Sequence, residues 1–326
     1  MSTASRTEWQ PSASIDVVKQ RARMLQDLRA FFAARHVCEV ETPMLSSAAV
    51  TDVHLHSFKT WYRQSDFYLH TSPEFFMKRL LAAGSGDIYQ ICKVMRDDED
   101  SQRHSPEFSL LEWYRLGFDH QQLMAELEQL VHQLSEIFSA QGIKQPAEKI
   151  SYQQTFMQTL GVDPLAASVM ELEAVARQKN IEIPAGMEPE KNMWLDWLML
   201  AAIAPAFAKD RLTFIYDYPV SQAALACVSK TDSRVAHRFE MYCGELELAN
   251  GFYELTDAVE QRQRFVHDNQ QRVAQGLPAM PIDEKFLAAL ESGMPTCAGV
   301  AVGLDRLLMV LLGKTQIRDV LSFEIL

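Results

Sequence analysis

The C-terminal stretch Gly299-Val-Ala301-Val-Gly303-Leu-Asp-Arg306 combines small residues with a cation in a pattern suited to a phosphate-binding turn. Gly299 and Gly303 carry no Cβ, so the backbone at these positions can approach a ligand closely. Arg306 is placed to meet a polyphosphate. Ala301 departs from the small-residue pattern by one methyl group. Turns of this type also occur for packing alone, so the motif predicts a phosphate site only together with other residues.

A second candidate group surrounds a polar loop between two predicted strands, residues 87–95 and 108–116. The loop is longer than a hairpin needs for folding, which is typical of a functional loop. Arg96, at the end of the first strand, can hold a phosphate and a carboxylate together, and the rings of His104 and Phe108 can enclose a purine. The group favours a nucleotide site. A solvated charged loop with Phe108 in the core is the alternative.

Glu240, Glu247, Asn250 and Glu254 form a third group. In a continuous strand, residues seven apart point to opposite faces, so Glu240 and Glu247 converge only if the chain reverses near Gly244. Given that hairpin, the two carboxylates can bind a hard cation such as Mg²⁺ together with phosphate oxygens. Two glutamates on an exposed face are the alternative interpretation.

The fourth group consists of Ser72, Pro73, Glu74, Glu112 and Tyr114. Carboxylates near an aromatic hydroxyl suit a substrate that carries an ammonium group, because this three-donor charge needs several acceptors. Glu254 can then bind a second, distal amine. The alternative is structural: Glu74 favours a helix start through the helix dipole, and Tyr114 packs in the sheet.

Composition limits the class of protein that can carry these groups. The 326 residues are 48% hydrophobic and 23% charged, which is sufficient for a large core. The net charge of −12 argues against a wide nucleic-acid surface and favours a basic protein partner. The five cysteines lie far apart without a C-x-x-C pair, so we expect buried, reduced thiols and a cytoplasmic protein. The longest apolar run, residues 194–207, is too short to span a bilayer.

The hydrophobic pattern predicts the elements that position the candidate groups. Ser14 can cap a helix with a one-sided apolar stripe, which is followed by a β-prone segment ending at Pro43. Further strands are predicted at 67–71, 212–218 and 238–248, helices at 73–81, 119–141 and 256–275, and a strand, turn and helix at 297–312. After a lead of residues 1–14, we expect one α+β domain, residues 15–326, with a mostly helical insert at about 145–208.

Three stretches, taken in order, resemble the motifs of the class II aminoacyl-tRNA synthetases: Thr42-Pro43 after a long helix, residues 96–112, and residues 299–306. The lysine-type synthetases are the most similar, in the stretches Arg103-His-Ser-Pro-Glu-Phe108, Lys78-Arg-Leu-Leu81 and Glu247-Leu-Ala-Asn-Gly-Phe252. The resemblance covers residues 15–313 and implies the class II catalytic fold, a mainly antiparallel sheet flanked by helices. Lysine-type synthetases also carry an N-terminal anticodon-binding domain, for which we find no counterpart in this sequence.

A catalytic region of this kind without the anticodon-binding domain resembles the synthetase paralogues that ligate lysine to elongation factor P. The resemblance implies activation of (R)-β-lysine with ATP and transfer to a lysine of elongation factor P, with an aminomutase supplying the β-amino acid and without stable tRNA binding. Ser72, Trp113 and Ala301 fit these paralogues better than the parent synthetases. Because the first motif resembles a dimer interface, a homodimer is also implied.

The same resemblance implies a role for each candidate residue. Arg96 would contact the α-phosphate and the substrate carboxylate, Arg306 would contact the terminal phosphate, and both are implied catalytic residues. Glu240 and Glu247 would hold Mg²⁺. The implied ATP site consists of Arg96, Asp97, Asp98, His104, Ser105, Phe108, Glu247, Leu248 through its backbone, Gly303 and Arg306. The implied lysine site consists of Ser72, Pro73, Glu74, Glu112, Tyr114, Asn250, Glu254 and Ala301.

Departures from the family pattern leave alternatives open. The second motif has Asp98 where Glu is usual and Ser105 where Asn is usual, and both changes affect adenine recognition. A catalytically silent, synthetase-like binding protein is therefore one alternative, and a truncated ligase that attaches lysine to tRNA is another. At Ala301, one methyl group discriminates by only about 1–3 kcal/mol. We expect it to disfavour an α-amino group, and a neutral packing change is the alternative.

Overall fold

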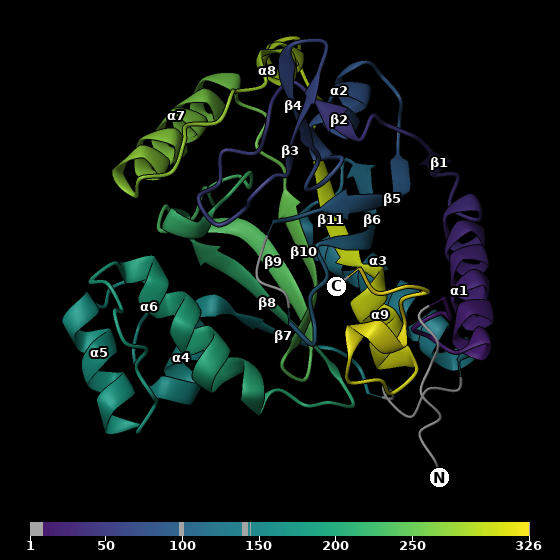
Figure 1. Ribbon diagram of the computed structural model, residues 1–326. Helices are drawn as coiled ribbons and strands as arrows, with labels where there is room; N and C mark the ends of the chain where they lie inside the picture. Colours follow the sequence, from purple (N-terminus) through teal and green to yellow (C-terminus); the bar gives the residue numbers. More distant parts are fainter. Residues whose placement is uncertain (1–8, 98–100, 139–142, 144, 326) are drawn as a thin grey trace.

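A computed structural model describes residues 9–97, 101–138, 143 and 145–325 of the protein (Figure 1). Within these ranges the chain forms a sheet of eight strands, a small sheet of three strands, and helices on both sides of the large sheet. The helices are α1 Ile15–Ala33, α2 Glu74–Ala82, α3 His120–Ile137, α4 Tyr152–Leu160, α5 Val169–Gln178, α6 Lys191–Leu198, α7 Ala258–Ala274, α8 Glu284–Glu291 and α9 Leu304–Leu311. The strands are β1 Cys38–Glu39, β2 Leu45–Ser46, β3 Lys59–Tyr62, β4 Ser65–Leu69, β5 Ile88–Met95, β6 Glu107–Leu116, β7 Glu148–Ser151, β8 Leu212–Pro219, β9 Val235–Cys243, β10 Leu246–Tyr253 and β11 Cys297–Gly303.

The strand order of the large sheet brings the candidate groups together. This order is β1-β5-β6-β11-β10-β9-β8-β7. The edge pairs β1–β5 and β7–β8 are parallel and the inner pairs are antiparallel, which confirms the predicted α+β fold with a mainly antiparallel sheet. The last strand in the sequence, β11, lies between β6 and β10. The C-terminal motif therefore lies between the second and third candidate groups.

One face of the large sheet packs against α1, α3 and α9. Trp113, Phe239 and Val302 point to this face, and Leu127 of α3 and Leu308 of α9 are buried in the same cluster. Because side chains alternate along a strand, the residues between these apolar positions point to the opposite face. The opposite face is therefore the one that carries the candidate groups.

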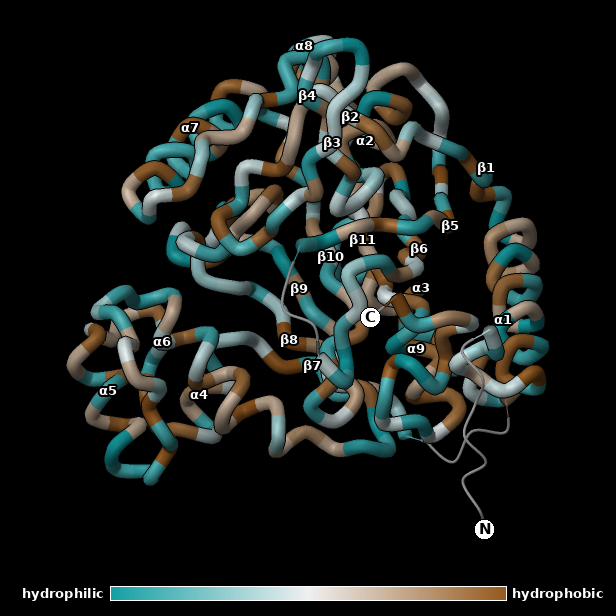
Figure 2. Tube along the Cα trace, viewed as in Figure 1, coloured by the Kyte–Doolittle hydropathy of each residue, from teal (hydrophilic) through white to brown (hydrophobic). Residues whose placement is uncertain are grey.

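The other helices cover the two ends of that opposite face. At one end, α2, α7 and α8 form a cluster with Ile88 and Tyr114, and at the other end α4, α5 and α6 form a cluster with Ile215 and Tyr242. Many residues of α7 are hydrophilic (Figure 2), and its buried side chains are those of Gln261, Phe265 and Arg272. Between the two clusters, the middle of the sheet carries mostly polar side chains.

Several predicted elements form as expected from local signals. The Ser14 side chain accepts a hydrogen bond from Val17 N and begins α1, and Gly161 ends α4 in the left-handed conformation. Helices α4, α5 and α6 occupy the segment predicted as a helical insert, and α6 continues into a π-helical turn, Met199–Ile203. Among the described residues, no helix has the length and apolar character needed to cross a membrane.

The structure corrects two predictions. The β-prone segment after α1 forms only the two-residue edge strand β1. Cys38 lies in this strand and is exposed, so the prediction that its thiol is buried was wrong. The five cysteines are free thiols, as expected. The stretch from Gly299 to Gly303 is a strand and not a turn, and α9 begins directly after it. The strand persists because β11 pairs with β6 on one side and with β10 on the other.

Candidate active site

The hairpin formed by β9 and β10 brings the two predicted metal ligands to one face of the sheet. Gly244 has a φ of +55° in the tight turn, and Glu247 pairs with Tyr242, two residues from Glu240 on β9. The condition for convergence, a reversal near Gly244, is therefore met, and the single strand predicted at 238–248 is wrong because this turn divides it into β9 and β10. The strand register shifts between Glu247 and Ala249, so a β-bulge at Leu248 places Asn250 on the same face as Glu247. The Leu248 side chain is buried in the core.

Four predicted site residues lie side by side across the sheet. Glu112 pairs with Ala301, Ala301 with Asn250, and Asn250 with Glu240, while Gln90 extends the series on the far side of Glu112. We call these five residues the central row. The Ala301 methyl group therefore lies between the Glu112 and Asn250 side chains. Within the described structure, Asn250 Oδ1 and Gln90 Oε1 are buried acceptors without a hydrogen-bond partner.

A lysine of the chain itself occupies the centre of the predicted ammonium site. Lys78 on α2 is fully buried, and its Nζ lies 2.6 Å from Glu74 Oε1 and 2.5 Å from Glu254 Oε2. Glu112 lies close enough to Lys78 for the ammonium charge to oppose the rise that burial causes in the Glu112 pKa. We call Lys78, Glu74, Glu112 and Glu254 the Lys78 cluster. The structure thus brings together carboxylates from α2, β6 and the end of β10.

Glu112 is held by two hydroxyl groups of the fourth candidate group. Ser72 Oγ donates to Glu112 Oε2 at 2.7 Å, and Tyr114 OH donates to Glu112 Oε1 at 2.7 Å. Ser72 Oγ also accepts from Glu74 N at 3.0 Å, and Pro73 precedes the first residue of α2. Burial, and then the neighbouring Glu74, raises the pKa of Glu112 to about 7.

Glu254 is also a buried carboxyl with a raised pKa. Burial raises this pKa to about 8, although Lys78 acts in the opposite direction. Its second oxygen, Oε1, has no hydrogen-bond partner among the described residues. The Lys78 cluster therefore contains more carboxylate than one ammonium group neutralises.

The two glycines of the C-terminal motif have different surroundings. A Cβ at Gly299 would lie 2.3 Å from the Tyr114 ring and 2.5 Å from Glu254 Oε1. The missing Cβ at Gly299 therefore makes room for the chain's own Tyr114 and Glu254 side chains, and the predicted close approach of its backbone to a ligand stays a prediction. At Gly303 the nearest atom to such a Cβ would be Leu248 O, 3.9 Å away, which leaves open space.

Arg96 follows β5 directly and lies beside the second motif. Its Nε and Nη2 each lie 3.4 Å from Thr71 O, and its guanidinium carbon lies 5.1 Å from the centre of the Phe108 ring. Phe108 is half-buried, so one guanidinium is held between the Ser72 segment and an aromatic ring. This position lies at the end of β5, in the strand next to Glu112.

Arg306 joins the second and third motifs. In the first turn of α9, it donates through Nη1 to Glu247 O at 3.0 Å, and its Nη2 lies 2.6 Å from His104 Nε2. Asp305 holds this turn in place because its buried carboxylate accepts from Ser109 N at 2.7 Å and from Arg21 Nη1 at 2.6 Å. The predicted polyphosphate contact thus lies beside Glu247 and the polar loop.

The remaining predicted residues of the loop have hydrogen bonds and neighbours of their own. Asp97 is exposed and donates through its backbone N to His56 O at 2.8 Å, while Ser105 Oγ donates to Glu107 O at 2.9 Å. His104 and Ser105 also line a cavity of about 260 Å³ together with C-terminal residues such as Ile317. Asp98 lies outside the described residues, so its predicted contact with adenine stays a prediction.

The predicted metal ligands have different partners. Glu240 is buried, ion-paired with Arg238, and accepts from Tyr242 OH at 2.5 Å. Glu247 is half-buried, and its pKa is raised to about 7 by withdrawal from water and then by the charge of Glu240. Two carboxylates that repel each other on one face are suited to a cation between them, so these residues fit a divalent metal ion.

Sequence reasoning missed the side chains that neutralise the site. Arg238 and Glu240 are two residues apart in a strand, so their spacing alone indicated a shared face. Asp305 stands between the motif residues Leu304 and Arg306, but no local pattern indicates its bond to the distant Arg21. Lys78 was noted only as part of a family stretch, because nothing near it in the sequence indicates full burial.

Comparisons with known proteins agree with this geometry. Residues 8–325 match the family described as tRNA synthetases class II (D, K and N). An elongation factor P–(R)-β-lysine ligase from Proteus mirabilis is 48% identical over 324 residues, which cover 98% of each chain. Proteins of the same name from Salmonella arizonae and Salmonella typhi are each 46% identical over 323 residues, covering 97% of each chain.

Proposed function

Because this chain belongs to the class II tRNA synthetases of the D, K and N type, an ATP-using family, we propose that it ligates (R)-β-lysine to elongation factor P. The amino acid is first activated as an acyl-adenylate, with release of pyrophosphate. A lysine side chain of elongation factor P then attacks the acyl carbon, and AMP leaves. Supply of (R)-β-lysine by an aminomutase and assembly as a homodimer belong to the same proposal.

The charge of the Lys78 cluster is the observation that supports a diamino acid as substrate. One ammonium and three carboxylates leave a net charge of −2 when all are ionised, in a site where all but Glu74 are almost fully buried. An uncompensated buried charge is strongly unfavourable. The two ammonium groups of lysine or β-lysine would neutralise the excess. Glu254 Oε1 and Asn250 Oδ1, which have no hydrogen-bond partner among the described residues, would accept hydrogen bonds from them.

Arg96 would hold the carboxylate of the amino acid and the α-phosphate of ATP. It lies at the end of β5, outside the Lys78 cluster but beside the segment that carries Ser72. A guanidinium can bind both anions through its planar set of donors. The substrate would therefore span the site, with its ammonium groups at the Lys78 cluster and its carboxylate at Arg96.

Adenylate formation needs no general base, because the substrate carboxylate is already the nucleophile. The protein would accelerate this step by positioning the carboxylate with Arg96 and by neutralising the polyphosphate charge with Arg306. Gly303 leaves the open space beside Leu248 O that a closely bound nucleotide requires. A Mg²⁺ ion held by Glu240 and Glu247 would supply further positive charge to the phosphate oxygens.

The transfer step does need a proton acceptor, since the attacking lysine amine must be neutral. A carboxyl with a pKa near the working pH is suited to this task. Burial, and then the neighbouring Glu74, raises the pKa of Glu112 to about 7, so this carboxyl can accept a proton near neutral pH. AMP then leaves with the electrons of the acyl–phosphate bond.

Mass spectrometry of elongation factor P tests the proposal directly. The acceptor is incubated with this protein, Mg-ATP and either (R)-β-lysine or α-lysine. We expect the mass increase of one lysyl group with the β isomer and little or none with the α isomer. Absence of both a mass increase and ATP–pyrophosphate exchange would instead favour a catalytically silent protein.

A further inference from the structure

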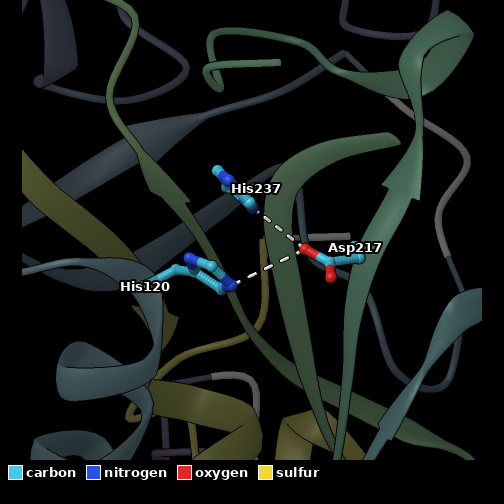
Figure 3. A group of neighbouring side chains, drawn as sticks. All are labelled: His120, Asp217 and His237. Carbon is cyan, nitrogen blue, oxygen red and sulfur yellow. Dashed lines mark hydrogen bonds and ion pairs between the residues drawn. The ribbon is translucent and has the colours of Figure 1, made fainter. Parts of the chain in front are cut away.

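Three side chains on the α3 side of the large sheet, His120, Asp217 and His237, point toward one another (Figure 3). His120 is the first residue of α3, Asp217 lies near the end of β8, and His237 lies near the start of β9. The three therefore come from separate elements. None of them has a part in the function proposed above.

Distances within this group fit a single small cation. Asp217 Oδ1 lies 3.0 Å from His237 Nδ1 and 3.6 Å from His120 Nε2, and one ligand atom from each residue lies within 4.8 Å of the other two. Ligands bound at about 2.0–2.2 Å around a tetrahedral Zn²⁺ ion are separated by about 3.3–3.6 Å. The distances from Asp217 Oδ1 to the two histidine nitrogens are thus already close to the separations of ligand atoms around a bound ion, although the structure contains no ion.

The local backbone directs Asp217 toward the two histidines. The register between β8 and β9 shifts between Tyr216 and Tyr218, and Asp217 there has a φ of +57°, which places it in the left-handed region. Such bulges redirect a side chain relative to the regular strand. The imidazole rings of His120 and His237 stack with their centres 4.5 Å apart, and Asp217 Oδ1 lies 3.6 Å from His120 Nε2 and 3.0 Å from His237 Nδ1.

His120 has few polar contacts for a buried imidazole. His120 is 7% exposed, and its Nδ1 has no hydrogen-bond partner among the described residues. Its Nε2 lies 3.2 Å from the Gln121 amide nitrogen and 3.6 Å from the Asp217 carboxylate. The ring therefore faces Asp217 with Nε2, and the nitrogen without a partner among the described residues is Nδ1.

We propose that His120, Asp217 and His237 form a binding site for a divalent transition-metal ion such as Zn²⁺. Two imidazoles and one carboxylate are suited to a borderline ion of this class and not to Mg²⁺, which prefers oxygen ligands. The Asp217 and His237 side chains are 28% and 24% exposed, which leaves an entry path and room for water as a further ligand. The bound ion would join α3 to the ends of β8 and β9.

Titration with Zn²⁺ tests this site in the full-length protein. Calorimetry in the presence of excess Mg²⁺ gives the number of sites and the affinity, and Co²⁺ absorption reports nitrogen and oxygen ligands. The variants are His237→Ala and Asp217→Asn, with His267→Ala on the exposed surface of α7 as the matched control. Circular dichroism and thermal unfolding of each metal-free variant establish that it is folded.

We expect one equivalent of Zn²⁺ bound by the wild type and by His267→Ala, with a higher Tm in its presence. In His237→Ala and Asp217→Asn the affinity should fall by at least about 10–100-fold, since even changes outside the ligand set cost that much. The rise in Tm should disappear in both variants. Absence of Zn²⁺ binding by the wild type, or equal binding by all the variants, would overturn the proposal.

Discussion

The Nζ atom of Lys78 lies 2.5 Å from Glu254 Oε2, and the two side chains are 0% and 1% exposed. A buried ion pair of this kind must be complete, because removal of one partner leaves the other charge buried without compensation. The chain has thus placed an ammonium group of its own among the carboxylates at which, in our proposal, the ammonium groups of the substrate bind. Several consequences of this arrangement are measurable.

Replacement of Lys78 tests its contribution to stability. We expect Lys78→Met to lower the free energy of unfolding by about 3–5 kcal/mol, because Glu74 and Glu254 then lose their shared cation. Lys59→Met is the matched control, since the Lys59–Asp66 pair is more than half exposed and such pairs contribute about 0–1 kcal/mol. Urea unfolding of both variants measures the difference. Equal losses of stability would contradict a special role for the buried pair.

Stability of the substrate-free protein should decrease as the pH rises from about 4.5 to about 8. The pKa values of Glu112 and Glu254 are raised by burial to about 7 and about 8, so the folded state binds more protons than the unfolded state in this interval. The contribution of Glu112 and Glu254 to the free energy of unfolding is fully present at a pH below the ordinary pKa of a glutamate. It is lost as the pH rises through their raised pKa values. Unfolding curves across this range measure the slope.

Glu112→Gln should make that pH dependence weaker, because a neutral amide replaces the titrating carboxyl while retaining an oxygen for Ser72 or Tyr114. As a control, Glu284→Gln removes an exposed carboxylate that is ion-paired on the surface of α8. The control should leave the slope between pH 4.5 and 8 nearly unchanged. A slope in Glu112→Gln equal to that of the wild type would exclude this carboxyl as a source.

Ala301→Gly should increase the activation of α-lysine relative to β-lysine. The Ala301 methyl group lies between Glu112 and Asn250 in the central row, so its removal widens the site next to the predicted amine acceptors. We expect a change of about tenfold to 200-fold in the ratio of the two rates, corresponding to about 1–3 kcal/mol. ATP–pyrophosphate exchange with each isomer measures this ratio, and an unchanged ratio would make Ala301 a packing residue.

The two glycines of β11 provide a matched pair of alanine substitutions. Gly299→Ala would place a methyl group against the Tyr114 ring and Glu254, so we expect a stability loss of about 1–3 kcal/mol and loss of lysine-dependent exchange. Gly303→Ala meets no atom closer than 3.9 Å and should fold normally. If ATP binds there, its KM for ATP should rise while its KM for lysine changes little. Equal stability of the two variants would contradict the crowding at Gly299.

The sequence by itself determined the features that depend on neighbouring residues. The Ser14 side chain caps α1, so the start of this helix could be predicted from one residue. Gly244 tolerates the positive φ of a tight turn, so its position indicated where a hairpin was possible. The three motifs, taken in their order along the chain, identified the family. These interactions operate over a few residues and leave a pattern in the sequence.

Only the tertiary structure decided which of the polar residues meet. The bulge at Leu248 turns Asn250 to the face of Glu247, and the fold places Lys78 of α2 against Glu254 at the end of β10. The group of His120, Asp217 and His237 likewise comes from three elements that have no shared sequence motif. Such contacts depend on strand order and on burial, which arise when distant segments pack together, and a buried charge acquires its partner only at that stage.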